Sequence, residues 1–255
     1  MVKGVLINYG GYPNTPSALM PDNGLANLAG SLIREGHEAI ILDYNTVDSI
    51  RRLFPQNREG NLDERIKQAQ KQDVADVANN ISNLIEKENI AFIGFKLVMG
   101  TGFESSIEIA EKVKEDNPEI PIFAGGPHID WFRERICEVT DVFVALAYGE
   151  GEETIVRLAE YVERKRELNE IPNLIYKENG DIKITPIKRI DDLNSLAFPI
   201  YDEDVYLAMK GDNKIKIIVI DESRGCPNRC NFCIHPIKSG NKRRIKDPSK
   251  LVSEI

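Results

Sequence analysis

Two spacings of apolar residues alternate along the first 165 residues of the chain. Short apolar runs are typical of buried strands, whereas apolar residues three and four positions apart are typical of one helix face. The strand-like runs are residues 2–8, 38–44, 90–98, 121–124 and 141–147. The helix-like segments are residues 25–33, 63–88, 103–113, 129–138 and 155–162.

This alternation predicts five strand–helix units. The runs are apolar at nearly every position, so both faces of each strand are buried, which is typical of a parallel sheet covered by helices. Right-handed crossovers then favour an α/β fold with a doubly wound, flavodoxin- or Rossmann-like sheet of five parallel strands. Asp22 or Asn23 is placed to cap the first helix.

The pattern changes in the last third of the chain. Residues 173–185 predict two short strands around Asn179-Gly180, a strong hairpin signal, and residues 187–204 are a charged connector that contains proline. Residues 215–220 (IKIIVI) predict a new buried strand. We therefore expect a sheet domain over residues 1–168, a hairpin and connector over 169–213, and the beginning of a further domain over 214–255.

Composition and charge exclude several classes of protein. No run approaches 18 apolar residues and no secretion signal is present, so we expect a cytoplasmic protein without a membrane span. The formal net charge is −8. The acidic first 220 residues argue against nucleic-acid binding, which needs a basic surface. The net-basic tail, residues 221–255, is interpreted as a solvated loop, and residues 238–246 alternatively face an anionic substrate.

Three of the four cysteines lie close together, at Cys226, Cys230 and Cys233. Thiolates at this spacing suit zinc or an iron–sulfur cluster. A structural zinc normally takes four protein ligands, and the fourth here is either His235 or the distant Cys137. Three cysteines instead leave one iron of a 4Fe–4S cube open to substrate. Cys137 is interpreted as a small buried hydrophobe.

The cysteine motif, C-x3-C-x2-C with Phe232 directly before its last cysteine, resembles that of the radical S-adenosylmethionine superfamily. Residues 244–255 are similar to the first barrel helix of that superfamily. The resemblance implies that the three cysteines hold a 4Fe–4S cluster and that Phe232 contacts S-adenosylmethionine. It also implies an external electron donor of the ferredoxin or flavodoxin kind.

The first domain resembles the cobalamin-binding domain that precedes the barrel in one branch of this superfamily. The resemblance lies in residues 23–29 (NGLANLA), 125–128 (GGPH) and 149–152 (GEGE). It implies that the loops after the first, third, fourth and fifth strands hold the corrin. The expected cobalamin contacts are Asn8, Gly10, Gly11, Thr101, Gly125, Gly126, Gly149, Glu150 and Gly151.

Two histidines, His37 and His128, are candidate cobalt ligands. No D-x-H-x-x-G string is present; His37 lies at the wrong edge of the sheet, and His128 is interpreted as a structural loop residue. We therefore expect cobalt without a histidine ligand.

By these resemblances the chain is expected to be a cobalamin-dependent radical S-adenosylmethionine enzyme. The first hypothesis is methyl transfer to an unreactive carbon through a 5′-deoxyadenosyl radical, and a cobalamin-containing cyclase or ring-rearranging enzyme is the alternative. A non-catalytic corrinoid-binding module with a zinc-stabilised loop is the alternative of another class. Only the beginning of a barrel fits after residue 214, so we expect these 255 residues to bind cobalamin rather than to catalyse alone.

Overall fold

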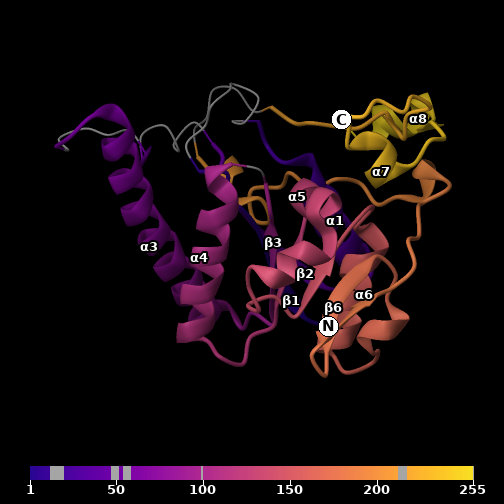
Figure 1. Ribbon diagram of the computed structural model, residues 1–255. Coiled ribbons are helices and arrows are strands. Elements are labelled where there is room, and N and C mark those ends of the chain that lie inside the picture. The colour runs from indigo at the N-terminus through magenta and orange to yellow at the C-terminus, as the bar shows by residue number, and fades with distance from the viewer. Residues whose placement is uncertain (12–19, 47–51, 54–58, 99, 212–216, 255) are drawn as a thin grey trace.

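The computed structural model describes residues 1–11, 20–46, 52–53, 59–98, 100–211 and 217–254. In these ranges a seven-stranded sheet has helices on both faces (Figure 1). The strand order is β2-β1-β3-β4-β5-β6-β7, parallel from β2 to β5 and antiparallel for β6 and β7. The strands are β1 (Lys3–Asn8), β2 (Glu38–Asp43), β3 (Phe92–Lys96), β4 (Ile122–Gly125), β5 (Ala145–Ala147), β6 (Leu174–Glu178) and β7 (Asp181–Ile184).

The five expected parallel strands are therefore present in the flavodoxin-like order 2-1-3-4-5. The predicted hairpin forms around Asn179-Gly180, both with positive φ. It does not stand apart from the sheet, because β6 pairs with β5 and extends the sheet at that edge. The expected strand over 141–147 is shorter than predicted, since only its last three residues pair as β5.

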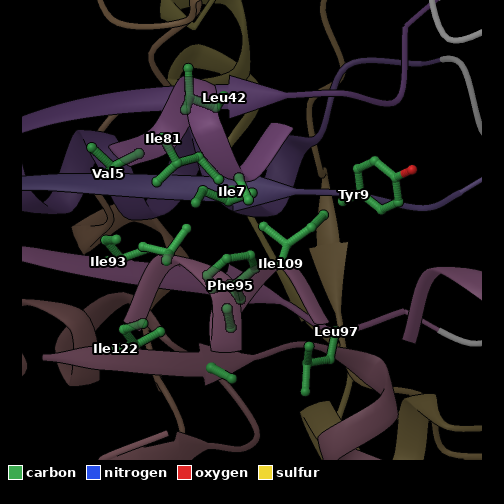
Figure 2. Close-up of a cluster of buried hydrophobic side chains, with 14 of the residues drawn as sticks. Val5, Ile7, Tyr9, Leu42, Ile81, Ile93, Phe95, Leu97, Ile109 and Ile122 are labelled. Atoms are coloured by element: carbon green, nitrogen blue, oxygen red, sulfur yellow. The ribbon is translucent and has the colours of Figure 1, made fainter. Parts of the chain in front are cut away.

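Alternation along the strands builds a core on each face of the sheet. Val5 and Ile7 pack under α3 and α4, whereas Leu6 packs under α1 and α6. Figure 2 shows the first of these cores, where side chains of β1, β3 and β4 meet Ile81 and Ile109. The α-helices beside the sheet are α1 (Asn23–Arg34), α3 (Leu62–Glu88), α4 (Thr101–Asp116), α5 (Pro127–Phe132) and α6 (Glu152–Val162).

Side-chain caps mark where α1 and α3 begin, whereas α4 and α6 begin at a glycine without one. The Asp22 carboxylate accepts a hydrogen bond from the Leu25 N–H at 2.9 Å, which confirms one of the two expected caps. Asn61 and Glu64 form a capping box at the start of α3. The helix expected over 129–138 is interrupted at Arg133, where φ is 52°, and continues as a 3₁₀ helix. The short 3₁₀ helices are Arg133–Glu138, Leu168–Glu170, Leu193–Ser195 and Leu207–Met209.

The connector after β7 crosses α1 to the opposite edge of the sheet. The Ile200 N–H donates to the Ala26 carbonyl at 3.0 Å, and the Ile41 N–H of β2 donates to the Val205 carbonyl at 2.7 Å. Tyr206 is fully buried beside β2. Its hydroxyl donates to Asp43 and accepts from the Asp22 N–H, so it joins the end of β2 to the start of α1.

The C-terminal segment differs from expectation. Residues 217–220 form no strand, and Ile217 and Ile218 are 44% and 39% exposed; residues 215 and 216 lie outside the described residues. Inside the described ranges these residues have no neighbouring strand to pair with, so an apolar run alone does not produce one. Residues 244–254, within the segment expected to be a single helix, instead begin with a short strand, and a helix follows it. The segment contains β8 (Ser223–Arg224), α7 (His235–Ser239), β9 (Arg244–Ile245) and α8 (Pro248–Ser253).

Asp221 anchors this segment to α1. Its carboxylate accepts from the Asn23 side chain at 2.9 Å and from Arg224 Nε at 2.7 Å, and Lys246 Nζ lies 3.7 Å away. Burial alone would raise the pKa of Asp221, but Arg224 and the hydrogen bonds outweigh it and lower the pKa to about 2. The contacts that hold this segment on α1 therefore depend on the ionised form of the Asp221 carboxylate.

Replacing Tyr206 by Phe removes a hydroxyl that bridges two buried groups. We expect the free energy of unfolding, measured in urea, to fall by about 2 kcal/mol, because a buried carboxylate and a backbone N–H each lose a partner. Tyr161→Phe is the matched control. No hydrogen bond of the Tyr161 hydroxyl is seen in the described ranges, and its ring packs against Phe123 and the neighbouring core. Equal effects of the two substitutions would contradict this role.

Asp221→Asn is expected to destabilise the protein in a pH-dependent way. A folded-state pKa near 2, below the ordinary 3.8, contributes stability above pH 3.8 that is lost as the pH falls toward 2. The unfolding free energies of wild type and variant should therefore differ by about 1–2 kcal/mol at neutral pH and converge in acid. Asp204→Asn, at an exposed pair with Lys210, should change little at either pH.

Candidate functional site at the carboxyl edge of the sheet

The loops after β1, β3, β4 and β5 meet at one edge because these four strands are parallel neighbours. The edge lies opposite the N-terminus, and α7 and α8 lie beyond it (Figure 1). The structure brings all nine residues predicted to contact cobalamin to this edge: Asn8, Gly10, Gly11, Thr101, Gly125, Gly126, Gly149, Glu150 and Gly151. Their contacts with cobalamin stay a prediction.

Some of the glycines at this edge are required by neighbouring backbone. A Cβ on Gly102 would lie 2.7 Å from the Gly10 backbone, so the loops after β1 and β3 touch without side chains between them. At Gly126, φ is 105° and a Cβ would lie 2.9 Å from the Leu97 carbonyl. By contrast, a Cβ on Gly125 or Gly149 would meet nothing closer than 3.6 Å. Crowding by neighbouring atoms therefore does not require glycine at these two positions, although at Gly149 the φ of 75° by itself favours glycine.

Several buried polar atoms at this edge have no hydrogen-bond partner in the described part of the chain. Among them are Asn8 Oδ1, His128 Nδ1, Asp130 Oδ2 and Glu152 Oε2. The other Asp130 oxygen accepts from the Gly149 N–H at 2.7 Å, and burial raises the pKa of the Asp130 carboxyl. Buried acceptors without donors are costly, so these atoms suit a ligand that carries N–H or O–H groups.

His128 lies in the first turn of α5 and not in a loop, which corrects the sequence interpretation. Its ring stacks on Phe103 with centroids 4.0 Å apart and approaches Phe132 at 4.6 Å. Burial lowers the pKa of the imidazole, so the neutral form is favoured. His37 lies at the opposite edge of the sheet, as expected, where its Nδ1 accepts from the Val2 N–H.

A charged network at the ends of β1, β2 and β3 was not predicted. Lys96, at the end of β3, pairs with Asp22, and Asn8 donates to the Asp43 carboxylate at 3.0 Å. Burial raises the pKa of Asp43, which the donated hydrogen bonds from Tyr206, Asn45 and Asn8 partly offset. The available signal was Lys96 itself, a charged residue inside an otherwise apolar run.

The cysteine loop follows β8. Gly225 has φ of 86°, and a Cβ there would lie 2.1 Å from the Lys242 carbonyl, so this glycine is required where the loop begins. The Cys226 N–H donates to the Gly240 carbonyl at 3.0 Å and closes the base of the loop. Cys226 and Cys233 are half-buried, Cys230 is exposed, and Phe232 is 86% exposed.

The donor set of this loop fits an iron–sulfur cluster in chemistry, with three free thiols and no fourth ligand close in the sequence apart from His235. As placed, no three Cys, His, Asp or Glu side chains of the described residues form a group that holds a metal. Binding of a metal can be coupled to the folding of the segment that carries its ligands. Cys137 is half-buried against the core, and burial raises the pKa of its thiol.

The β5–α6 turn binds the basic tail through buried ion pairs. Arg244 and Glu150 form a two-pronged pair, with Nη2–Oε1 at 2.6 Å and Nη1–Oε2 at 2.9 Å. Arg224 Nη2 lies 2.5 Å from Glu152 Oε1. The solvated-loop interpretation of the tail is therefore wrong at Arg224 and Arg244. Glutamates at a helix N-terminus and arginines in a basic tail were the signal, but their spacing does not say that they meet.

None of the helices in the described ranges combines the length and apolarity needed to cross a membrane.

Comparison with known proteins gives relatives named as methyltransferases and as cyclases. The chain is 26% identical over 236 residues to an uncharacterised methyltransferase, PH0819, of Pyrococcus horikoshii, covering 92% of this chain and 45% of that protein. It is 28% identical over 192 residues to the anaerobic magnesium-protoporphyrin IX monomethyl ester cyclase of Rubrivivax gelatinosus, covering 70% and 34%. The chain thus spans less than half the length of these relatives.

A solved structure shows the same fold. The radical S-adenosylmethionine methyltransferase TsrM of Kitasatospora setae, with cobalamin and a 4Fe–4S cluster bound, superposes with a TM-score of 0.68 at 18% identity. The match covers 100% of this chain and 46% of TsrM. The α/β fold class predicted from the alternating pattern is confirmed. The family model described as the B12 binding domain matches residues 14–159, more than half of the chain, and the protein therefore belongs to the B12-binding domain family.

Proposed function

We propose that the protein is a cobalamin-dependent radical S-adenosylmethionine enzyme that transfers a methyl group to an unreactive carbon. Membership of the B12-binding family and the methyltransferase names of PH0819 and TsrM support this function. The cysteine motif supports it as well, because it resembles that of the radical S-adenosylmethionine superfamily, and this resemblance implies three thiols that hold a cluster with one open iron.

The observation that carries the cobalamin part is that buried polar atoms at this edge have no partner among the described residues, among them the acceptors Asn8 Oδ1 and Asp130 Oδ2 and the imidazole nitrogen His128 Nδ1. Cobalamin carries amide side chains around its corrin ring, and amide N–H groups are the donors that these atoms lack. Gly125 and Gly149, where a Cβ would meet no close neighbour, let the backbone approach a ligand at the same edge.

Cys226, Cys230 and Cys233 would hold the cluster, and Phe232 would contact S-adenosylmethionine beside it. When bound, such a cluster supplies the electron that cleaves S-adenosylmethionine, and cobalamin supplies the methyl group. The chain positions these groups: α7, which follows the cysteines, packs against α5 at the carboxyl edge. The cysteine loop and the proposed cobalamin site thus both lie at the carboxyl edge of the sheet.

A ring-forming reaction is the second candidate, supported by the cyclase of Rubrivivax gelatinosus among the relatives. Both reactions use the same binding groups, so the described residues do not separate them. Product analysis with methyl-labelled S-adenosylmethionine does: label in the product supports methyl transfer, and unlabelled product with a new ring supports cyclisation. We also propose a cytoplasmic location and a ferredoxin- or flavodoxin-like electron donor, since low-potential clusters need such a donor.

The proposal predicts that cluster and cobalamin bind independently to separate residues. After anaerobic reconstitution with iron and sulfide, the variant with Cys226, Cys230 and Cys233 all changed to Ser should lose bound iron and sulfide. Its affinity for hydroxocobalamin, measured by equilibrium dialysis, should stay within about twofold of wild type, because the two sites share no ligand.

Cys137→Ser is the matched control, since Cys137 packs against the core in a different part of the fold. It should keep both iron and cobalamin. Stoichiometric zinc without sulfide in the wild-type protein would instead support a non-catalytic, zinc-stabilised module. Failure of the wild-type protein to bind hydroxocobalamin would overturn the cobalamin assignment.

A further inference from the structure

The first turn of α6 and the residues before it carry two glutamates that pair with arginines of the same chain. Glu150 and Glu152 are both buried, and burying carboxylates is costly unless each one has a charged partner. The partners are Arg244 and Arg224, which flank the cysteine loop in the sequence. The side chains of Arg244 and Glu150 are only 7% and 1% exposed.

Arg244 contacts three separate parts of the chain. Besides Glu150, its guanidinium donates to the Ser239 carbonyl at 2.8 Å and to the Ile190 carbonyl. Ser239 is the last residue of α7, so this arginine binds the far end of the segment that carries the cysteines. The Ile190 N–H donates back to Glu150 Oε2 at 2.8 Å, which draws the connector into the same cluster.

Arg224 makes the corresponding contact at the near end of the loop. It pairs with both Glu152 and Asp221, and these two carboxylates raise its pKa although burial alone would lower it. Arg224 and Arg244 are register partners in the β8–β9 ladder. The two arginines therefore leave one small ladder side by side and reach two glutamates on either side of Gly151.

We propose that Glu150 and Glu152 are positioning residues that hold the cysteine loop on the β5–α6 turn through Arg244 and Arg224, and so fix where its cluster stands at the carboxyl edge. This role differs from the cobalamin contact expected of Glu150, because both of its oxygens are engaged within the chain. The proposal rests on the proposed function only in naming a cluster as what the loop holds.

The geometry predicts a local effect of breaking the pair. In hydrogen–deuterium exchange of the 255-residue protein, Arg244→Met should speed exchange of residues 221–246 by at least about tenfold, because Glu150 loses its buried partner. Exchange in β1, β3 and β4 should stay at the wild-type rate. Arg243→Met is the matched control, since Arg243 is exposed and the ion pair seen for it among the described residues is with the exposed Glu222.

A double-variant cycle tests whether the two residues act through each other. In the double variant Glu150→Gln/Arg244→Met, residues 221–246 should exchange no faster than in the faster single variant. The reason is that the same Arg244–Glu150 ion pair is lost in both single variants and in the double variant. Additive effects in the cycle, an unchanged rate in Arg244→Met, or equal loosening of β1, β3 and β4 would each overturn the proposal.

A second readout concerns the cluster itself. After anaerobic reconstitution, a chelator should remove iron from Arg244→Met several-fold faster than from wild type or Arg243→Met, with hydroxocobalamin affinity unchanged. Equal removal rates would refute the positioning role. If wild type takes up no iron, the cluster assignment fails, while the exchange experiment still decides whether the ion pairs hold the loop.

Discussion

Parallel pairing of β1, β3, β4 and β5 is the constraint on which the rest of the structure depends, because it sends four chain crossings out of the sheet at one edge. The loops pack closely there, as where Gly10 meets Gly102. Buried side-chain atoms at the same edge, such as Asn8 Oδ1 and Asp130 Oδ2, have no hydrogen-bond partner among the described residues, and this supports the edge as the proposed binding site.

Three of the acidic side chains near this edge pair with a cation from a distant segment: Lys96 with Asp22, Arg244 with Glu150 and Arg224 with Glu152. Asp43 and Asp130 instead accept hydrogen bonds from neutral groups. Phosphate groups often bind at helix N-termini, but the glutamates make the start of α6 unsuitable for an anion. The same charges make it a suitable anchor for a basic segment of the chain.

Local signals in the sequence were sufficient for the five parallel strands, but not for the pairing of the hairpin with β5. Apolar runs, helical spacing and Asn179-Gly180 depend on neighbours within a few residues, and the strand order, the Asp22 cap and the hairpin agree with them. Interactions between distant segments were not predictable in this way. Nothing near Tyr206 in the sequence indicates that its hydroxyl meets Asp43, 163 positions away. The same holds for Arg244, whose burial depends on a glutamate 94 positions earlier. The prediction of a strand was wrong over 217–220 for a related reason, since a strand needs a neighbouring strand to pair with as well as apolar residues.

The bridge between Val205–Tyr206 and β2 has a consequence for how far the folding unit extends. β2 is an outer strand, and an outer strand with open backbone groups is a template for pairing with other chains. Here the connector occupies part of that edge, with the Val205 carbonyl accepting from Ile41. This edge of the sheet is therefore partly covered by residues that follow β7 by about twenty positions in the sequence. In physical terms this part of the connector belongs to the sheet domain, because it occupies backbone groups of the outer strand that would otherwise be open to another chain.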